Sequence, residues 1–451
     1  MNEQTRPSGM RAFFVVWAGQ IISLLGTAMT EFGLTIWAYE KTGQATPLAL
    51  IGFFFVFPLI VLSPFAGAII DRSNRKLMMM LSDLVAGVVT IAQFLLLATG
   101  RLEIWHLYVA AIITGASQAF QWPAFSAGIT LMLRKEHLGR ANGMMELAGS
   151  ASGIFAPLAA GALLPLIKLQ GIMIIDIVSF AFAVGALLLV HVPQPQVTEA
   201  GRRGQGSLWK ESGYGFRYIV ERPSLLGLQL VFMVGNLFSG LAWPVMAAMI
   251  LARTDSNTIV FGTMQSAGAI GGIVGGAVMG AWGGPKRKVH GVLAGWIAAS
   301  LLGAAPLGIG QTLQVWAVAN FLGGFVSPII NGSNQAIWQS KVAPDVQGRV
   351  FSVRRMIAWS LSTLATLAAG PLADKVLEPA MQPGGSLAST FGGLVGTGPG
   401  AGIGLLFVLA AIGGSLAGLG GYLFPQIRNA ETILPDYDAL PGGSPQAEQP
   451  A

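Results

Sequence analysis

The sequence predicts an all-α membrane protein with twelve transmembrane helices in two six-helix, pseudo-symmetric bundles. Of the 451 residues, 53% are hydrophobic and only 10% are charged, whereas ordinary soluble domains carry about 25% charged residues. Apolar stretches of roughly 20 residues, long enough to cross a bilayer, recur along most of the chain. The 61 glycines suit helices that pack closely within a membrane.

Charged residues, prolines and glycines divide the apolar stretches into twelve predicted spans. Those of the first half are 12–39, 46–70, 77–100, 104–133, 141–167 and 171–191, and those of the second half are 223–252, 257–281, 288–309, 312–340, 350–373 and 399–425. We therefore expect an N-terminal bundle over 1–192 and a C-terminal bundle over 223–425. Residues 193–222 form a cytoplasmic linker, either a simple tether or one that carries an amphipathic surface helix. The polar tail 426–451 is expected to be disordered.

Lys and Arg are distributed unevenly between the two sides of these spans. Of the 26 basic residues, 21 fall on the side of the N-terminus and five on the other side. The positive-inside rule therefore places both termini in the cytoplasm. Because the basic residues form short clusters between spans, the net charge of +6 reflects topology, and we expect no nucleic acid partner.

The residue types that support catalysis or metal binding are scarce. The chain has no cysteine and four histidines, and the histidines lie near span ends without a His-x-x-x-His pair, so we expect no metal site. No nucleophile–base cluster is evident, and no G-x-x-x-x-G-K-[ST] loop occurs. The sequence therefore predicts neither enzymatic activity nor a cofactor, and transport energy must come from a gradient or a partner.

Several segments resemble a known family. Gly67-Ala-Ile-Ile-Asp71-Arg72-Ser-Asn74-Arg75-Lys76 resembles the signature loop G-x-x-x-D-R-x-G-R-K of the major facilitator superfamily. Asn74 replaces the second Gly, and Asn tolerates the positive φ of a tight turn. Ser152-Gly153-Ile-Phe-Ala156-Pro157-Leu-Ala-Ala160-Gly161 resembles a weakened antiporter motif. Gly348-Arg-Val-Phe-Ser-Val-Arg-Arg-Met-Ile and Gly370-Pro-Leu-Ala-Asp374 resemble bacterial drug-efflux members related to macrolide exporters.

This resemblance covers roughly residues 10–435 and implies the fold, antiport and a bacterial cytoplasmic, or inner, membrane. It also implies a cytoplasmic gate of opposite charges between neighbouring loops. We expect the gate to consist of Asp71, Arg72, Arg75, Glu136, Arg140 and Arg349. Exposed ion pairs are each worth only about 0.2–1 kcal/mol, so such a gate biases two conformations without fixing the fold.

Four acids lie within predicted spans, and ionisable residues inside a membrane are candidates for proton coupling. They are Glu31, Asp83, Glu146 and Asp176. Asp83 and Glu146 lie roughly 10 Å from the cytoplasmic ends of their helices, and Asp176 is similarly close to the outer end. Each of these three is alternatively a structural charge held at a helix end, for example by Lys76 or Arg140.

Glu31 is the deepest of the four acids. Gln20, Ser23, Thr27 and Glu31 recur at helical spacing and form one polar stripe on an apolar helix. Partial desolvation favours the neutral form of such a carboxyl. We expect Glu31 to be the main coupling acid, with an acid merely wetted by an outer vestibule as the alternative.

Similar polar stripes occur on three further spans that the resemblance places around a central cavity. Together with the stripe on the first span, the predicted lining residues are Gln20, Ser23, Thr27, Gln118, Gln121, Asn236, Trp243, Asn320, Asn331, Asn334 and Trp338. The alternative for each is interhelical hydrogen bonding. One acid among amides and aromatics suits a bulky amphipathic or cationic substrate. A compact anion calls for a buried cation, and every Lys and Arg is predicted at or near a span end.

The sequence thus favours a monomeric multidrug-type exporter that works by proton antiport and alternating access. Its expected partners are a small-molecule substrate, protons and membrane lipid. A lysophospholipid or siderophore exporter of the same fold is one alternative. A channel- or scramblase-like facilitator without proton coupling is another.

Overall fold

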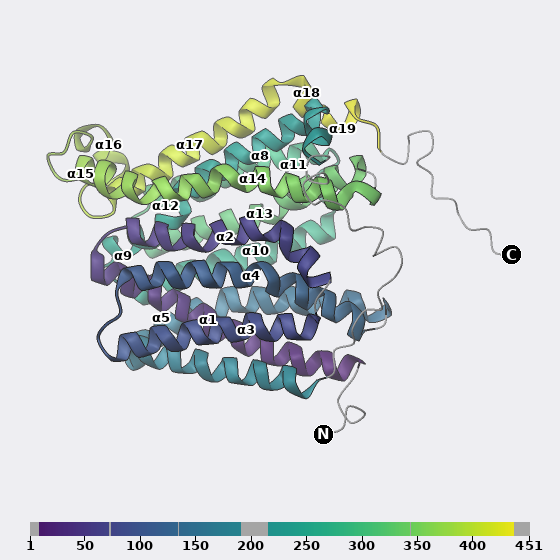
Figure 1. Ribbon diagram of the computed structural model, residues 1–451. Helices are drawn as coiled ribbons and strands as arrows, with labels where there is room; N and C mark the ends of the chain where they lie inside the picture. Colours follow the sequence, from purple (N-terminus) through teal and green to yellow (C-terminus); the bar gives the residue numbers. More distant parts are fainter. Residues whose placement is uncertain (1–8, 72–73, 134, 191–214, 343, 437–451) are drawn as a thin grey trace.

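Helices account for all of the regular structure in the described part of the chain, because backbone groups inside lipid must be hydrogen-bonded within the chain itself. The computed structural model describes residues 9–71, 74–133, 135–190, 215–342 and 344–436 (Figure 1). Within these ranges, side chains are not described for 63–65, 67–71, 75, 122–123, 126–131, 135–143, 145–147, 344–349 and 352. Most of these positions lie at the predicted cytoplasmic end, on the right in Figure 1.

The helices before residue 190, called here the N-terminal half, follow the predicted spans closely. They are α1 (Gly9–Thr42), α2 (Thr46–Asp71), α3 (Arg75–Ala98), α4 (Ile104–Met132) and α5 (Lys135–Leu189). Asn74 caps α3 by accepting a hydrogen bond from the backbone N–H of Leu77 at 3.0 Å, with φ −68°. The positive φ expected for Asn74 is therefore wrong. Its side-chain oxygen instead satisfies a free N–H at the helix start.

The long helix α5 breaks at Lys168, whose φ of 57° is not helical. Ser152, before the break, donates to the carbonyl oxygen of Leu24, and Asp176, after it, lies against Gly26. The two limbs of α5 therefore return to the same level of α1. This reversal lies where the sequence predicts the turn between spans 141–167 and 171–191.

The helices after residue 215, called here the C-terminal half, are more often interrupted. They are α8 (Pro223–Ala242), η2 (Trp243–Val245), α9 (Met246–Arg253), α10 (Thr258–Trp282), α11 (Lys288–Ala298), η3 (Ala299–Ala304), α12 (Ala305–Ile309), α13 (Leu313–Lys341), α14 (Pro344–Leu372), η4 (Ala373–Leu377), α15 (Glu378–Met381), α16 (Ala388–Val395), α17 (Ala401–Leu423), α18 (Pro425–Arg428) and α19 (Ala430–Ile433). Residues 215–220 form a short helix, and the rest of the predicted linker lies outside the described residues. The segments η3 and η4 are π-helical, a geometry often found at functional sites.

The exterior of the protein has the character of a lipid-facing surface. Within the described ranges, nine helical segments are long and apolar enough to cross a membrane. Large apolar side chains point outward, including Leu166 (76% exposed), Phe182 (64%) and Leu423 (78%). Exposing such groups to water is unfavourable, whereas hydrocarbon surrounds them at no comparable cost. The chain is therefore an integral membrane protein.

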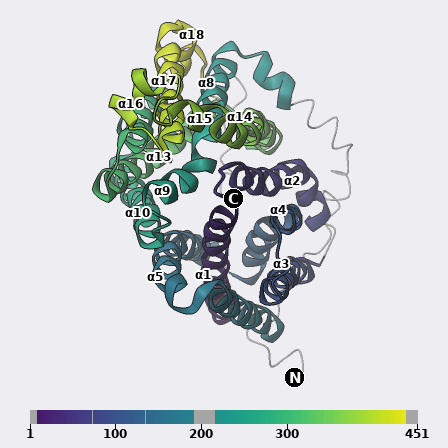
Figure 2. The same cartoon turned by 90° about the vertical axis from the view of Figure 1, so that its left-hand side faces the viewer.

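The buried apolar residues form three clusters that show how the halves meet. One cluster joins residues of both halves, such as Ile36 and Phe261, at the predicted outer end. A second cluster belongs to the C-terminal half alone, and a third, around Phe13, to the N-terminal half alone. Figure 2 looks onto the predicted outer end, with the purple and blue helices on one side and the green and yellow helices on the other. The described cores thus unite the halves at the outer end and are separate at the inner end.

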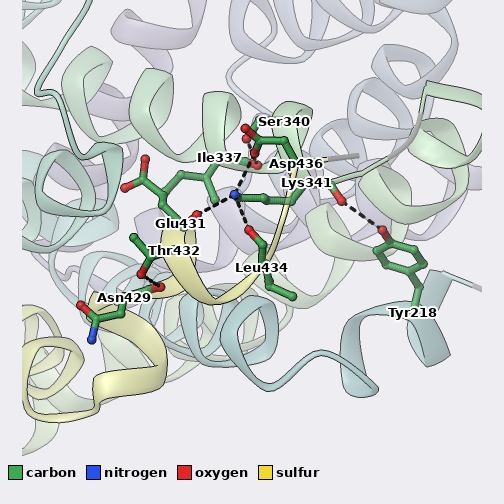
Figure 3. Close-up of polar contacts among 9 residues, drawn as sticks. All are labelled: Tyr218, Ile337, Ser340, Lys341, Asn429, Glu431, Thr432, Leu434 and Asp436. Carbon is green, nitrogen blue, oxygen red and sulfur yellow. Dashed lines mark hydrogen bonds and ion pairs between the residues drawn. The ribbon is translucent and has the colours of Figure 1, made fainter. Parts of the chain in front are cut away.

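The predicted tail differs from the structure over residues 426–436. These residues include α18 and α19 and lie against the inner end of the C-terminal half, whereas 437–451 lie outside the described residues. The buried ammonium of Lys341 donates to the carbonyl oxygens of Glu431 and Leu434 and pairs with Asp436 at 2.7 Å (Figure 3). A buried ammonium needs such acceptors. The polar composition alone did not indicate this anchor.

The contact between α10 and α13 makes a prediction about stability. A Cβ on Gly275 would overlap the carbonyl oxygen of Phe325, whereas a Cβ on Gly276 meets nothing within 4 Å. We therefore expect Gly275→Ala to destabilise the protein by about 1–3 kcal/mol through overpacking. Gly276→Ala is the matched control on the same helix. Apparent melting temperatures in detergent measure both, and an equal effect of the two substitutions would contradict the close approach of α10 and α13.

Candidate functional site

Of the cavities in the described part of the protein, two lie inside the halves, one mainly in each half, and a third of about 250 Å³ lies beside Asp374 at the predicted outer end. The C-terminal cavity, about 850 Å³, lies among α8, α10, α11, α13, α14 and α17 and also touches Gly153 of α5. The N-terminal cavity, about 220 Å³, lies among α1, α3, α4 and α5. The single central cavity expected from the sequence is thus divided between the halves in this structure. The volume of the larger cavity is within the range of small-molecule sites.

Five of the six residues predicted to line the cavity in the second half do so. They are Asn236, Trp243, Asn320, Asn331 and Asn334. Trp338 does not. It is fully buried behind the wall and donates through Nε1 to the Asn334 oxygen at 3.1 Å. A large indole on a polar helix stripe thus supports the wall instead of facing the cavity.

The amides in this wall are held in place by neighbouring helices. Asn236 on α8 donates to the carbonyl oxygen of Ala358 on α14 at 3.0 Å. Asn320 on α13 donates to the carbonyl oxygen of Met264 on α10 at 2.8 Å. These bonds join helices across the C-terminal half and leave the amide oxygens as acceptors. Both roles foreseen from the sequence, lining and interhelical bonding, are therefore combined at Asn236 and Asn320.

Among the described side chains that line the C-terminal cavity, Arg354 and Arg355 are the charged ones. The sequence analysis placed every Lys and Arg at or near a span end, and the pair does lie at the start of the apolar segment Val353–Met381, although both side chains line the cavity. Helix α14 begins at Pro344, six residues before the predicted span. At 1.5 Å per residue, Arg354 lies about 15 Å from the start of its helix.

All five residues predicted to line the cavity in the first half face the N-terminal cavity. They are Gln20, Ser23, Thr27, Gln118 and Gln121. The charged residues that line this cavity are Asp83 and Asp176. The two described cavities therefore carry charges of opposite sign.

Asp83 is buried and bonded to two amides. Gln20 donates to its Oδ2 at 2.8 Å, and Gln121 donates to its Oδ1 at 2.6 Å. Lys76, considered above as a structural partner for Asp83, donates to the carbonyl oxygens of Leu188 and Val190. Asp83 therefore belongs to the cavity wall, with neutral donors around it.

Asp176 is buried and bonded to two hydroxyls. Thr27 donates to its Oδ1 at 3.0 Å, and Thr90 donates to its Oδ2 at 3.2 Å. A hydroxyl can donate to a carboxylate and can also accept from a carboxylic acid. The Asp176 site is therefore satisfied in both protonation states without moving a side chain.

Glu31 lines neither of these cavities, and its side chain is exposed. Its carboxylate forms no hydrogen bond or ion pair with the described residues. It lies one turn beyond Thr27, the partner of Asp176, on the same face of α1. The side chains of Glu146 and of the predicted gate residues Asp71, Arg72, Arg75, Glu136, Arg140 and Arg349 lie outside those that the structure describes.

The sequence reasoning missed Arg354, Gln335 and Thr90 as cavity residues. Arg354 accompanies Arg355 as an adjacent basic pair inside an apolar helix, which is a usable signal. Gln335 follows Asn331 at i+4 and continues a predicted stripe. Thr90 stands alone among apolar residues, and its role becomes visible only through Asp176.

The halves are bonded to each other near the predicted outer end. The Asp374 carboxylate on η4 accepts hydrogen bonds from the backbone N–H groups of Ala45 and Thr46 at 2.8 and 2.6 Å, and from the Thr46 hydroxyl. Thr258 on α10 donates to the carbonyl oxygen of Gly161 on α5 at 2.8 Å. A third bond, from the Ser266 hydroxyl to the carbonyl oxygen of Ile154 at 2.6 Å, lies near the middle of the spans. The bonds of Asp374 and Thr258 hold the halves together at the outer end, so this end is closed.

A lipid-facing helical exterior around internal cavities of opposite charge defines a polytopic membrane transporter. A sequence model described as the Major Facilitator Superfamily matches residues 16–366. The chain therefore belongs to this superfamily, whose members are membrane transporters and not enzymes.

Relatives and solved structures agree with this assignment. The chain is 25% identical over 383 residues to macrolide efflux protein A of Streptococcus pyogenes, covering 81% of this chain and 90% of the relative. It is 25% identical over 395 residues to the multidrug efflux pump Tap of Mycolicibacterium fortuitum, covering 79% and 90%. A bacterial homologue of the iron transporter ferroportin in an inward-facing state matches with a TM-score of 0.63 at 15% identity, over 91% of this chain and 100% of that chain. That last likeness shows the fold alone.

The outer closure makes a prediction about conformation. Asp374→Ala removes the acceptor for the start of α2, a loss of about 1 kcal/mol, and should raise the outward-open population about five-fold. A Met264→Cys reporter, buried behind the closure in a chain without other cysteines, should then react faster with an impermeant maleimide added from outside.

Glu378→Ala is the matched control for this change. Glu378 accepts from the backbone N–H groups of Gly400 and Ile403 within the C-terminal half, so its loss weakens one half without releasing the other. Equal labelling of the Met264→Cys reporter in both variants would mean that Asp374 does not hold the halves together.

Proposed function

We propose that this protein is a secondary active transporter that exports a hydrophobic or amphipathic small molecule by proton antiport with alternating access. The observation that carries the proposal is the pair of oppositely charged cavities, one in each half, behind a closed outer end. Secondary transporters work by exposing a site between two halves first to one side of the membrane and then to the other. The names of two relatives, a macrolide efflux protein and a multidrug efflux pump, support export.

The proposed topology has twelve spans in two six-helix bundles, with 1–192 and 223–425 as the bundles and 193–222 as a cytoplasmic linker. Both termini lie in the cytoplasm of a bacterium, and the protein works as a monomer in the cytoplasmic membrane. The uneven distribution of the 26 basic residues supports this orientation. The closed end is then the outer one, and the described conformation faces the cytoplasm.

We place the proton route in the N-terminal half. Glu31 lies one helical turn from Thr27, and Thr27 donates to Asp176. Thr90, the other partner of Asp176, is seven residues from Asp83 on α3, a spacing of about 10 Å. The three acids thus follow one another from the outer toward the inner side. Burial without a cation partner disfavours the ionised form of a carboxyl, which makes Asp176 and Asp83 suitable proton acceptors.

Two other functions fit the same fold. Export of a lysophospholipid or siderophore uses the same architecture with a different substrate. A channel- or scramblase-like facilitator moves its substrate without exchanging protons. Measuring proton movement together with substrate flux distinguishes such a facilitator from a proton antiporter.

The topology predicts which side of the membrane the linker occupies. A Gln205→Cys variant should resist an impermeant maleimide added to intact cells and should react after the membrane is made permeable. The absence of native cysteine gives a clean background. Labelling from outside intact cells would contradict the cytoplasmic linker.

The proton route predicts which acids couple transport. Radiolabelled erythromycin, chosen because of the name of the first relative, is loaded into proteoliposomes with an internal pH dye. Glu31→Gln, Asp83→Asn and Asp176→Asn should each reduce pH-driven efflux about 100-fold or more, within the range for loss of a proton-transfer group. Erythromycin binding should stay nearly unchanged, because these acids lie away from the C-terminal cavity.

Glu40→Gln is the matched control, since Glu40 is an exposed acid near the outer end of the same helix α1. It should transport like wild type. Normal proton-driven efflux in Asp83→Asn and Asp176→Asn would exclude the proposed route. Erythromycin flux without proton movement in wild type would favour the facilitator.

A further inference from the structure

Arg354 is held as a rigid cation at the edge of the C-terminal cavity. Its Nη1 donates to the Gln335 side-chain oxygen at 2.9 Å. Its guanidinium carbon lies 5.1 Å from the ring centre of Trp338 and 5.6 Å from that of Phe351. A guanidinium has five N–H donors in a planar fork, and one of them is used on a described side chain. Its position is fixed while most of its hydrogen-bonding capacity stays available.

Arg355, the neighbouring cation, is exposed and also lines the cavity. It forms no hydrogen bond or ion pair with a described residue. The other polar residues described in this lining are serines, asparagines and glutamines, and no acid is among the described lining residues. Two guanidinium groups therefore face one cavity without a counter-charge from its described lining.

The rest of the lining favours an apolar body attached to the anion. Trp243, Trp296 and Trp359 line the cavity together with phenylalanines from α8 and α14. Rings of this kind bury large apolar areas. A small inorganic anion would leave these surfaces uncovered, whereas an amphipathic molecule would cover them.

We infer that the C-terminal cavity is a binding site for an amphipathic anion, with Arg354 and Arg355 holding its phosphate, carboxylate or sulfonate and the tryptophans holding its apolar part. This rests on the proposed export function and adds to its substrates a class of amphipathic molecules that carry a negative group. Arginine suits the role because its fork matches the oxygens of such anions. The acids of the N-terminal half are then available to bind protons.

A matched pair of fluorescent probes tests the inference. The probes are 8-anilinonaphthalene-1-sulfonate and N-phenyl-1-naphthylamine, which share their aromatic body and differ in the sulfonate. Binding is titrated on the full chain in nanodiscs of a zwitterionic lipid, with the signal of empty nanodiscs subtracted. Arg354→Gln and Arg355→Gln should each weaken sulfonate binding about ten-fold, the loss expected for a charge-assisted hydrogen bond, and leave the neutral probe within about two-fold.

Two further variants separate charge from packing. Arg354→Lys keeps the charge but loses the planar fork, so it should bind the sulfonate between wild type and Arg354→Gln. Arg287→Gln removes an exposed cation from the same end of the C-terminal half but outside the cavity lining, and it should bind both probes like wild type. Unchanged neutral-probe binding shows that each variant is folded.

Several outcomes would overturn the inference. An equal loss of both probes in Arg354→Gln and Arg355→Gln would mean that the arginines only shape the cavity. Sulfonate binding that is unchanged in both variants, or equally lost in Arg287→Gln, would mean that there is no anion site at the pair. Normal proton-coupled erythromycin efflux together with either result would reject this site and keep the export proposal. Arginine-dependent sulfonate binding without proton coupling would keep this site and reject the proposed proton antiport.

Competition identifies the source of the anion. Displacement of the sulfonate probe by lysophosphatidylglycerol but not by glycerol phosphate shows that the site takes a lipid-like molecule with its apolar chain. Displacement by both shows that the charged group alone suffices and that soluble anions also enter. Both results require the arginine pair, and Arg354→Gln should abolish the competition in each case.

Discussion

The backbone N–H groups at the start of α2 have no acceptors within their own helix, and a carboxylate from the other half supplies them. Asp374 accepts from Ala45 and Thr46 at the closed end of the protein. A helix start carries partial positive charge, so an anion is favoured there. The bond joins a helix of one half to a π-helical turn of the other, so it can exist only while the outer ends are together. The shared apolar cluster at that end depends on the same approach.

The described apolar cores are joined at the outer end and separate at the inner end. The inner cores of the two halves are separate clusters, one around Phe13 and one around Trp338. Each half thus has a buried apolar core of its own, and no described cluster joins the halves at the inner side. A conformational change that breaks the outer bonds can rotate the halves as bodies without unfolding either core. The distribution of buried contacts, more than any single residue, is what permits the proposed alternating access.

The sequence predicted the helices well because their limits are set by local chemistry. Apolar length, prolines and basic clusters marked the spans, and the break at Lys168 fell between two predicted ones. Most errors arose where contacts between residues far apart in the sequence determine the structure. Trp338 is covered by tertiary packing, and Lys341 orders a segment 90 residues further along the chain. The error at Asn74 is local, because its side chain caps the helix that follows instead of forming a turn. Arg354 does lie near the end of a span, but hydropathy alone does not show that its side chain lines a cavity. The gate and Glu146 remain predictions.

Separating the charges between the halves has a consequence for coupling. When a proton and a cationic substrate share one acid, they exclude each other directly at that site. Here the acids of the N-terminal cavity and the arginines of the C-terminal cavity lie in different halves, so a proton and an anionic substrate do not compete for the same group. In the proposed antiport, their fluxes are linked through the conformation of the whole protein, because each ligand binds one exposure of its site better than the other. An arginine pair without a lining acid suits this arrangement. A permanent carboxylate partner would occupy the guanidinium groups, and the substrate would have to displace it in every cycle.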